Sequence, residues 1–207
     1  RDSYTMPSHE VRKVKNQKLL IAFALLTTLL VSTYVTAFAA SPSLVDQYPG
    51  LQHLTALVSE SQITPMHLVA YRAAKLAMEK LGFQRGDLSV LALTNAGSAI
   101  IDDRFPTSSC LDALALTSGC SESSQNLIAI NSGKWKPLWF AFYYKNIGQC
   151  VYAEVRSDVL ASYMEKWMSA SDKSAVQLEF LGLSDDEVFA KISVENIEAD
   201  YLLSNPE

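Results

Sequence analysis

The chain has 207 residues, of which 49% are hydrophobic and 19% charged, which excludes a disordered tail and predicts one domain with a buried core. Residues 41 to 207 carry 12 lysines and arginines against 20 acidic residues, a net charge of −8. Because so acidic a domain repels phosphate backbones, and no run of basic and aromatic residues offsets this, we expect no nucleic-acid partner.

An apolar segment follows a basic cluster near the N-terminus. Residues 19 to 40 contain no charged side chain, and four basic residues stand between positions 12 and 18. This order is typical of a secretory signal, with Ala37 and Ala39 at the small-residue positions of a cleavage site. We expect residues 1 to 40 to be a signal peptide cleaved after Ala39, or else an uncleaved membrane anchor. Either way, the rest of the chain would be extracytoplasmic, in the periplasm or secreted.

Residues 41 to 60 form the next segment. Its prolines and glycine, at Pro42, Pro49 and Gly50, indicate a linker that leads into a short apolar helix from about Leu51 to Val58. No functional residue stands out in this segment.

The clearest helix extends from Thr64 to Leu81. Thr64 can cap it, Pro65 suits its first turn, where the backbone amide needs no partner, and Gly82 ends it. Charged residues recur on one side of this helix and small or apolar residues on the other. The charged side holds Arg72, Lys75 and Glu79, and the apolar side holds Met66, Ala70, Ala73, Ala74 and Ala77. The alanines allow close packing against a neighbouring element.

The remaining pattern predicts an α+β fold. A helix should begin near Ser109, with Asp112 in a capping-box position or orienting a ligand, and should end at Gly119. A buried strand is expected over 87–94, a meander of antiparallel strands over 127–130, 135–144 and 149–155, helices over 158–169 and from about 171, and a strand over 187–194. Because helices and strands do not alternate regularly, we expect an antiparallel or mixed sheet packed against helices.

Familiar catalytic signatures are absent from the sequence. There is no glycine-rich phosphate loop, no Gly-x-Ser-x-Gly elbow, no pair of histidines at helical spacing and no Cys-x-x-Cys. These absences favour a binding role and leave enzyme activity open.

Three segments carry a resemblance to a known family. Residues 108–121 contain a cysteine, an aspartate two residues later and a Thr-Ser-Gly-Cys-Ser turn, and residues 66–77 and 185–189 add a Tyr-Arg helix and an acidic-Phe segment. Over about residues 62–194 the chain resembles the FmdE family, which is named for a component of formylmethanofuran dehydrogenase, so we assign residues 61–207 to such a domain. The resemblance implies a cysteine-lined cavity that holds a transition metal.

The family's Gly-His-x-Cys-Pro-Gly motif is replaced in this chain. Aligned without gaps, its histidine and cysteine fall on Gln62 and Thr64. Cys110, Cys120 and His67 remain as candidate metal ligands, for which zinc or another divalent transition metal is the expected ion. For His67 the alternative is a packed or hydrogen-bonded core histidine.

The other cysteines and aromatic residues leave alternatives open. A thiol near a helix N-terminus has a lowered pKa, so Cys110 is either a reactive thiolate or an inert buried thiol. A disulfide between Cys110 and Cys120 is disfavoured, because one helix at about 1.5 Å per residue would hold them too far apart. Cys150 and the aromatic run 139–144 are expected in the core, although the run can also line a cofactor pocket. Asp102 and its neighbours are expected to form a solvated loop.

Three functions follow from these observations. The first is an exported protein that binds a metal ion or small ligand, the second is a thiol-based redox enzyme using Cys110, and the third is an interaction module that has lost the family's ligands. Membrane contact is expected only through an uncleaved N-terminal segment, and a homodimer is an open alternative for the oligomeric state.

Overall fold

The computed structural model describes residues 43–131 and 137–196. The predicted signal peptide or anchor lies outside these residues. Within the described ranges, no helix is both long and apolar enough to span a bilayer.

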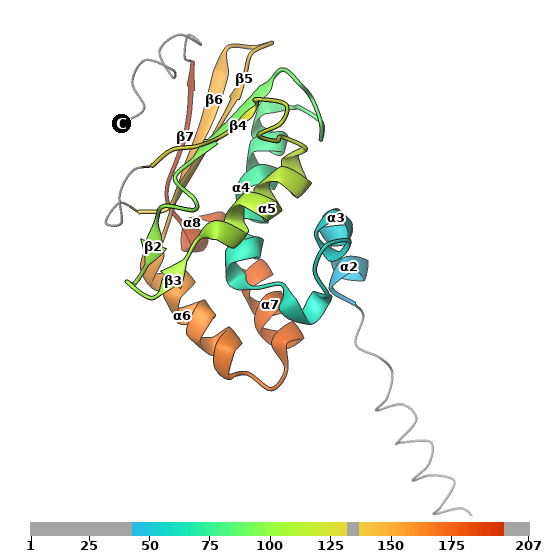
Figure 1. The fold of residues 1–207 in the computed structure, drawn as a ribbon, viewed down its shortest axis with the longest axis vertical. Helices are drawn as coiled ribbons and strands as arrows, with labels where there is room; N and C mark the ends of the chain where they lie inside the picture. The colour runs from blue at the N-terminus through green and yellow to red at the C-terminus, as the bar shows by residue number, and fades with distance from the viewer. Residues whose placement is uncertain (1–42, 132–136, 197–207) are drawn as a thin grey trace, which may run out of the picture. The chain divides into compact units, whose positions relative to one another are not determined.

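A mixed sheet of five strands forms one layer of the domain (Figure 1). The strand order is β4-β1-β5-β6-β7, with β1 parallel to β4 and every other neighbouring pair antiparallel. The strands are β1 (Val90–Thr94), β4 (Leu127–Ala129), β5 (Trp139–Tyr144), β6 (Gln149–Val155) and β7 (Phe189–Asn196). Together with the helices, this sheet confirms the predicted α+β class.

Helices α4 (Pro65–Leu81) and α5 (Ser108–Ser118) lie side by side on one face of the sheet (Figure 1). Helix α4 has the predicted limits, with Thr64 as N-cap and Gly82 in the left-handed region at φ +74°. Its predicted alanine side is buried, because Ala70, Ala74 and their neighbours pack against α5 and the sheet. Helices α6 (Ser157–Ser169) and α7 (Lys173–Leu181) pack against α4 and against each other.

The prediction that all these strands are antiparallel is wrong for β4, which pairs with β1 in parallel. Helix α5 carries the chain from β1 back to the same end of the sheet, so β4 runs parallel to β1. Strand β5 then pairs with the other side of β1, so that Ala92 lies between Leu127 and Phe142. The hydrophobic pattern located these strands, but it carries no information on which strands are neighbours. Most of the predicted turn at 131–134 lies outside the described residues.

Two helix starts also differ from the prediction. Helix α5 begins at Ser108 with Thr107 as N-cap, so Ser109 and Asp112 do not form the expected capping box. Near the C-terminus, Ser184 and Glu187 form a capping box that starts the one-turn helix α8 (Asp185–Val188). Strand β7 therefore begins only at Phe189.

The segment expected as a linker contributes to the core. Its helical turns are α2 (Leu44–Gln47), η1 (Pro49–Leu51), α3 (Gln52–Thr55) and η2 (Glu60–Gln62). Leu44, Leu51 and Leu54 are buried in the main hydrophobic cluster. Residues 44–62 therefore pack as one unit with the rest of the described domain.

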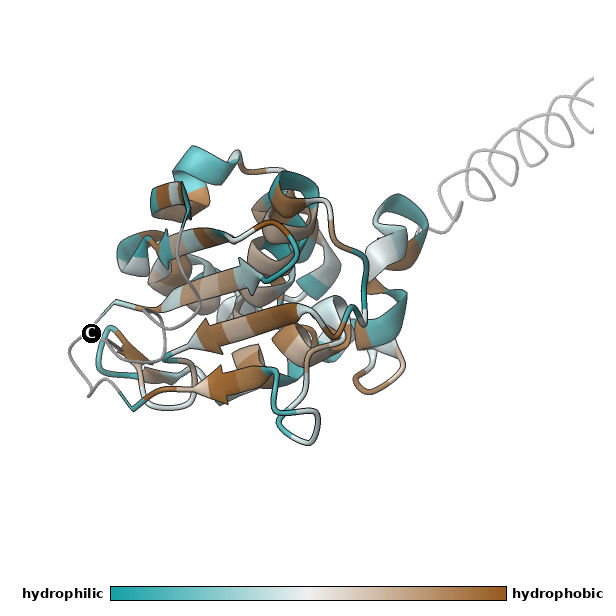
Figure 2. Cartoon of the chain, turned by 90° about the horizontal axis from the view of Figure 1, so that it is seen from above, coloured by the Kyte–Doolittle hydropathy of each residue, from teal (hydrophilic) through white to brown (hydrophobic). Residues whose placement is uncertain are grey.

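The sheet is apolar on both faces, and Figure 2 shows hydrophobic residues along its strands. Phe140 and Phe142 of β5 join the main core, while Ala141 and Tyr143 point to a second cluster with Cys150. Cys150 is therefore a core residue of a strand. The aromatic residues of β5 pack in the core as well, and they alternate between the two faces of the sheet.

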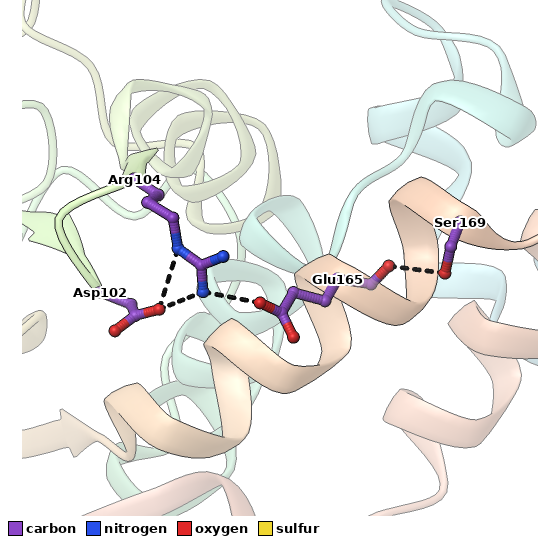
Figure 3. A network of polar contacts seen from close by, with 4 residues as sticks. All are labelled: Asp102, Arg104, Glu165 and Ser169. Carbon is purple, nitrogen blue, oxygen red and sulfur yellow. Dashed lines mark hydrogen bonds and ion pairs between the residues drawn. The ribbon is translucent and has the colours of Figure 1, made fainter.

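A small hairpin is joined to α6 through an arginine (Figure 3). The hairpin consists of β2 (Ile100–Ile101) and β3 (Phe105–Pro106), and its turn places Asp102 at φ +50°. Arg104 of this turn donates to Asp102 and, at 2.6 Å, to Glu165 of α6. Since these three side chains are each 53% exposed, the network is solvated, and we expect it to contribute little stability.

Candidate functional site

Cys110 lies in the first turn of α5 and is fully buried. Its Sγ donates to the carbonyl oxygen of Met66 in α4 at 3.1 Å. Burial raises the pKa of the Cys110 thiol. Of the two alternatives for Cys110, the structure favours the inert buried thiol, because a helix dipole stabilises a charge by about 1 kcal/mol, whereas full burial shifts a pKa by up to about 5 units. The thiol is held neutral and has no access to solvent.

His67 forms part of the cap of α4. The backbone N–H of Thr64 donates to His67 Nδ1 at 3.1 Å, and the Thr64 hydroxyl lies 2.9 Å from the same nitrogen. A backbone N–H can only donate, so Nδ1 carries the lone pair and the neutral ring has its hydrogen on Nε2. Burial lowers the His67 pKa, and the charge of Asp112 opposes this shift. A metal at Nε2 would require moving that hydrogen to Nδ1 and breaking the bond to Thr64.

Residues 61–66, which stand in place of the motif that the resemblance implied, are held by hydrogen bonds between protein groups. Gln62 is exposed, and Thr64 caps α4. The buried Gln177 of α7 donates from Nε2 to the carbonyl oxygens of Glu60 and Ile63, both at 2.6 Å. The side-chain amide of Gln177 thus fixes the segment to α7.

The predicted ligands do not form a metal site. Cys120 follows Gly119 at the far end of α5, buried beside Val90, while Cys110 lies at the start of the helix. Cys110, Cys120 and His67 form no group able to hold a metal ion, and neither does any other set of three His, Cys, Asp or Glu residues in the described ranges. All three cysteines are free. The residues present therefore do not fit the metal that the resemblance implied.

A cavity of about 450 Å³, which we call the α4 cavity, lies beside the C-terminal half of α4. Its apolar wall includes Tyr71, Met78 and Phe83. Phe83 follows the helix-ending Gly82 and is held by ring contacts with Phe142 and Tyr144, at centroid distances of 6.3 and 5.9 Å. These contacts give the cavity a fixed aromatic floor.

A close backbone approach shapes the same cavity. A Cβ on Gly50 would lie 2.7 Å from the Tyr71 hydroxyl oxygen, so any larger residue at this position would displace the Tyr71 ring. Burial raises the Tyr71 pKa to about 12, and its hydroxyl makes no hydrogen bond to any residue the structure describes. The phenol therefore remains protonated at neutral pH as a free donor.

Polar and charged side chains from three segments also line the α4 cavity. They are His53 of α3, Lys75 and Glu79 of α4, and Arg85 of the loop that leads to β1. A smaller hollow of about 170 Å³ lies next to it, and Tyr71, Lys75 and Glu79 line both. The site thus offers an apolar wall with several hydrogen-bond donors.

Sequence reasoning missed this site. Tyr71 and Lys75 belong to the family-like helix, but they were assigned no ligand role. His53, Phe83 and Arg85 belong to no motif, and they come to the cavity from separate segments. The one local signal was an aromatic residue directly after the helix-ending Gly82.

A comparison with protein families identifies the domain. The family model described as FmdE, Molybdenum formylmethanofuran dehydrogenase operon, matches residues 62–196, which is more than half of the chain. No curated protein matches the chain. The matched range runs from just before α4 to the end of β7 and includes Arg72, Cys110 and Asp185. The chain therefore belongs to the FmdE family.

Proposed function

We propose that this chain is an exported binding protein of the FmdE family that holds a small organic molecule in the α4 cavity and does not act as an enzyme. The observation that carries the proposal is a hollow of about 450 Å³ with an aromatic floor and with Tyr71, Lys75 and Arg85 as hydrogen-bond donors in its lining. Ligand pockets in proteins span about 300 to 1,000 Å³ and combine an apolar lining with a few polar groups. The α4 cavity matches this description.

The state of Cys110 and His67 favours this function over metal binding or thiol chemistry. A thiolate ligand or nucleophile must be deprotonated and reachable, whereas the Cys110 thiol is fully buried and bonded to Met66. His67 uses Nδ1 as an acceptor for Thr64. Export is supported by the order of basic and apolar residues in the N-terminal segment.

Two naphthalene compounds test ligand binding. Naphthalene-2-carboxylate and its neutral amide, naphthalene-2-carboxamide, each combine an aromatic body with one polar group. We expect at least one of them to bind with one-to-one stoichiometry in calorimetry and to shift the methyl NMR signal of Met78, identified with a Met78→Leu variant. Gln84→Trp should fill part of the cavity and weaken binding. Lys80→Trp is the matched control, because Lys80 is exposed on α4 and does not line the cavity.

Metal analysis tests the competing function. We expect purified protein to hold far less than one zinc per chain, and a Cys110→Ser, Cys120→Ser double variant to give the same value. One zinc per chain that is lost in the double variant would contradict our proposal. So would a failure of both naphthalene compounds to bind.

A further inference from the structure

The charges around the α4 cavity indicate what kind of molecule it binds. We propose that its ligand is an organic carboxylate, with the anionic group at Arg85 and the apolar body against Phe83. This inference rests on the proposed function and adds the chemical class of the ligand.

Arg85 is the central observation. Its Nε donates to the carbonyl oxygen of Leu116 at 2.8 Å, which fixes the base of the guanidinium. Its terminal nitrogens make no hydrogen bond or ion pair with any residue in ranges 43–131 and 137–196. By contrast, Arg72 and Arg104 are both paired with carboxylates. A guanidinium presents parallel N–H groups that match the two oxygens of a carboxylate.

Other donors line the same cavity. The only partner of Lys75 in the described part of the chain is Glu79 at 3.6 Å, and these side chains are 48% and 69% exposed. Exposed ion pairs of this kind contribute little free energy, so Lys75 can turn to a ligand at small cost. The Tyr71 hydroxyl is a further donor, which has no hydrogen-bond partner among residues 43–131 and 137–196. A carboxylate could therefore accept hydrogen bonds from more than one side.

The sign of the charge around the cavity favours an anionic ligand. The cavity lining has two basic residues, Lys75 and Arg85, and one acidic residue, Glu79. Residues 41 to 207 as a whole carry a net charge of −8. The cavity is thus a locally positive spot on an acidic domain, which attracts an anion to this place and disfavours it elsewhere.

The apolar wall requires an apolar body on the ligand. Phe83 is only 1% exposed and lies against two other aromatic rings. Met78 and the ring of Tyr71 continue this surface. Met78 is only half-buried, so a ring or hydrocarbon chain on the ligand would cover its exposed part, whereas an inorganic anion would leave that part in contact with water.

The two naphthalene compounds separate this inference from the proposed function. They share one ring system and differ in charge. We expect the carboxylate to bind at least about 10-fold more tightly than the amide, as is typical when one charged hydrogen bond is gained. Arg85→Gln should remove about 10-fold of the carboxylate affinity and change the amide affinity by less than about 2-fold.

Arg156→Gln is the matched control. Arg156 is also exposed, and its Nε also donates to one backbone carbonyl, that of Asp186, but it does not line the cavity. This variant has the same change in net charge and should bind both compounds like the wild type. Thermal unfolding of each variant would check that the fold is retained. Salt provides a test on the unaltered protein: from about 20 to 500 mM NaCl, only the carboxylate should bind more weakly.

The outcomes are distinguishable. If both compounds bind in the cavity with equal affinity, or if Arg85→Gln and Arg156→Gln behave alike, the inference is wrong and the proposed function stands. If neither compound binds, both fail.

Discussion

The guanidinium of Arg72 lies 2.6 Å from the carboxylate of Asp185 and joins two segments that are 113 residues apart in the chain. The Arg72 side chain is only 11% exposed, and its other terminal nitrogen donates to the carbonyl oxygen of Phe180 at 3.2 Å. One side chain of α4 thus holds the end of α7 and the start of α8. Both segments lie within the range that matches the FmdE family.

Replacing this arginine should destabilise the domain. Arg72→Ala removes a largely buried charge that is bonded to a carboxylate and a carbonyl, so we expect the free energy of unfolding to fall by about 2 to 3 kcal/mol. Lys75→Ala on the same helix, whose ion pair is exposed and 3.6 Å long, should cost less than about 0.5 kcal/mol. Urea denaturation measures both values. Equal losses would show that Arg72 does not hold these segments together.

Two glycines that end helices should differ in their tolerance of alanine. Gly119 and Gly82 both have a left-handed φ, +76° and +74°. Gly82→Ala meets no atom within 4 Å, so it should cost only the backbone strain, about 1 kcal/mol. A Cβ on Gly119 would lie 2.7 Å from Gly86 Cα, and the clash should raise the cost to about 3 kcal/mol or more.

The same denaturation assay distinguishes the two glycine variants. Similar losses for both would mean that the loop containing Gly86 moves away freely. In that case, the close contact would not fix the loop that carries Arg85.

His67 should make stability fall on the acidic side of neutrality. Burial lowers its pKa in the folded state, so the unfolded chain takes up the proton first. The stabilisation is therefore complete above the unfolded pKa of about 6.5 and is lost as the pH falls below it. His67→Gln cannot be protonated, while its side-chain oxygen can still accept the Thr64 N–H.

Urea midpoints at about pH 7.5, 6.5 and 5.5 test this prediction across that window. The wild type should lose more stability between pH 7.5 and 5.5 than the glutamine variant. Other titrating groups are common to the two proteins and cancel in the comparison. Parallel curves would imply that His67 titrates as it does in the unfolded chain.

The cysteines should be unreactive in the folded protein. Cys110, Cys120 and Cys150 are all buried, and burial raises the pKa of each thiol, that of Cys150 to about 11. At pH 8 we expect iodoacetamide to modify none of them in the time that gives complete modification in guanidinium. Peptide mass spectrometry identifies each site. Rapid modification of Cys110 in the folded state would restore the thiol-enzyme hypothesis.

The sequence alone determined the features that depend on neighbouring residues. The limits of α4 follow from Thr64, Pro65 and Gly82, whose backbone preferences act within one helical turn. Gly119 ends α5 for the same reason. The strand segments were visible as well, because a run of apolar and β-branched residues is a local property.

Only the tertiary structure decided the sheet order and the state of the site. The place of β1 between β4 and β5 depends on pairing between distant segments. The position of Cys110 in a helix suggested an activated thiol, but its pKa is set by the elements that cover it. The α4 cavity likewise combines His53, Phe83 and Arg85 from separate segments. Burial, and with it hydration and charge, is a property of the assembled fold, so no local spacing in the chain records it.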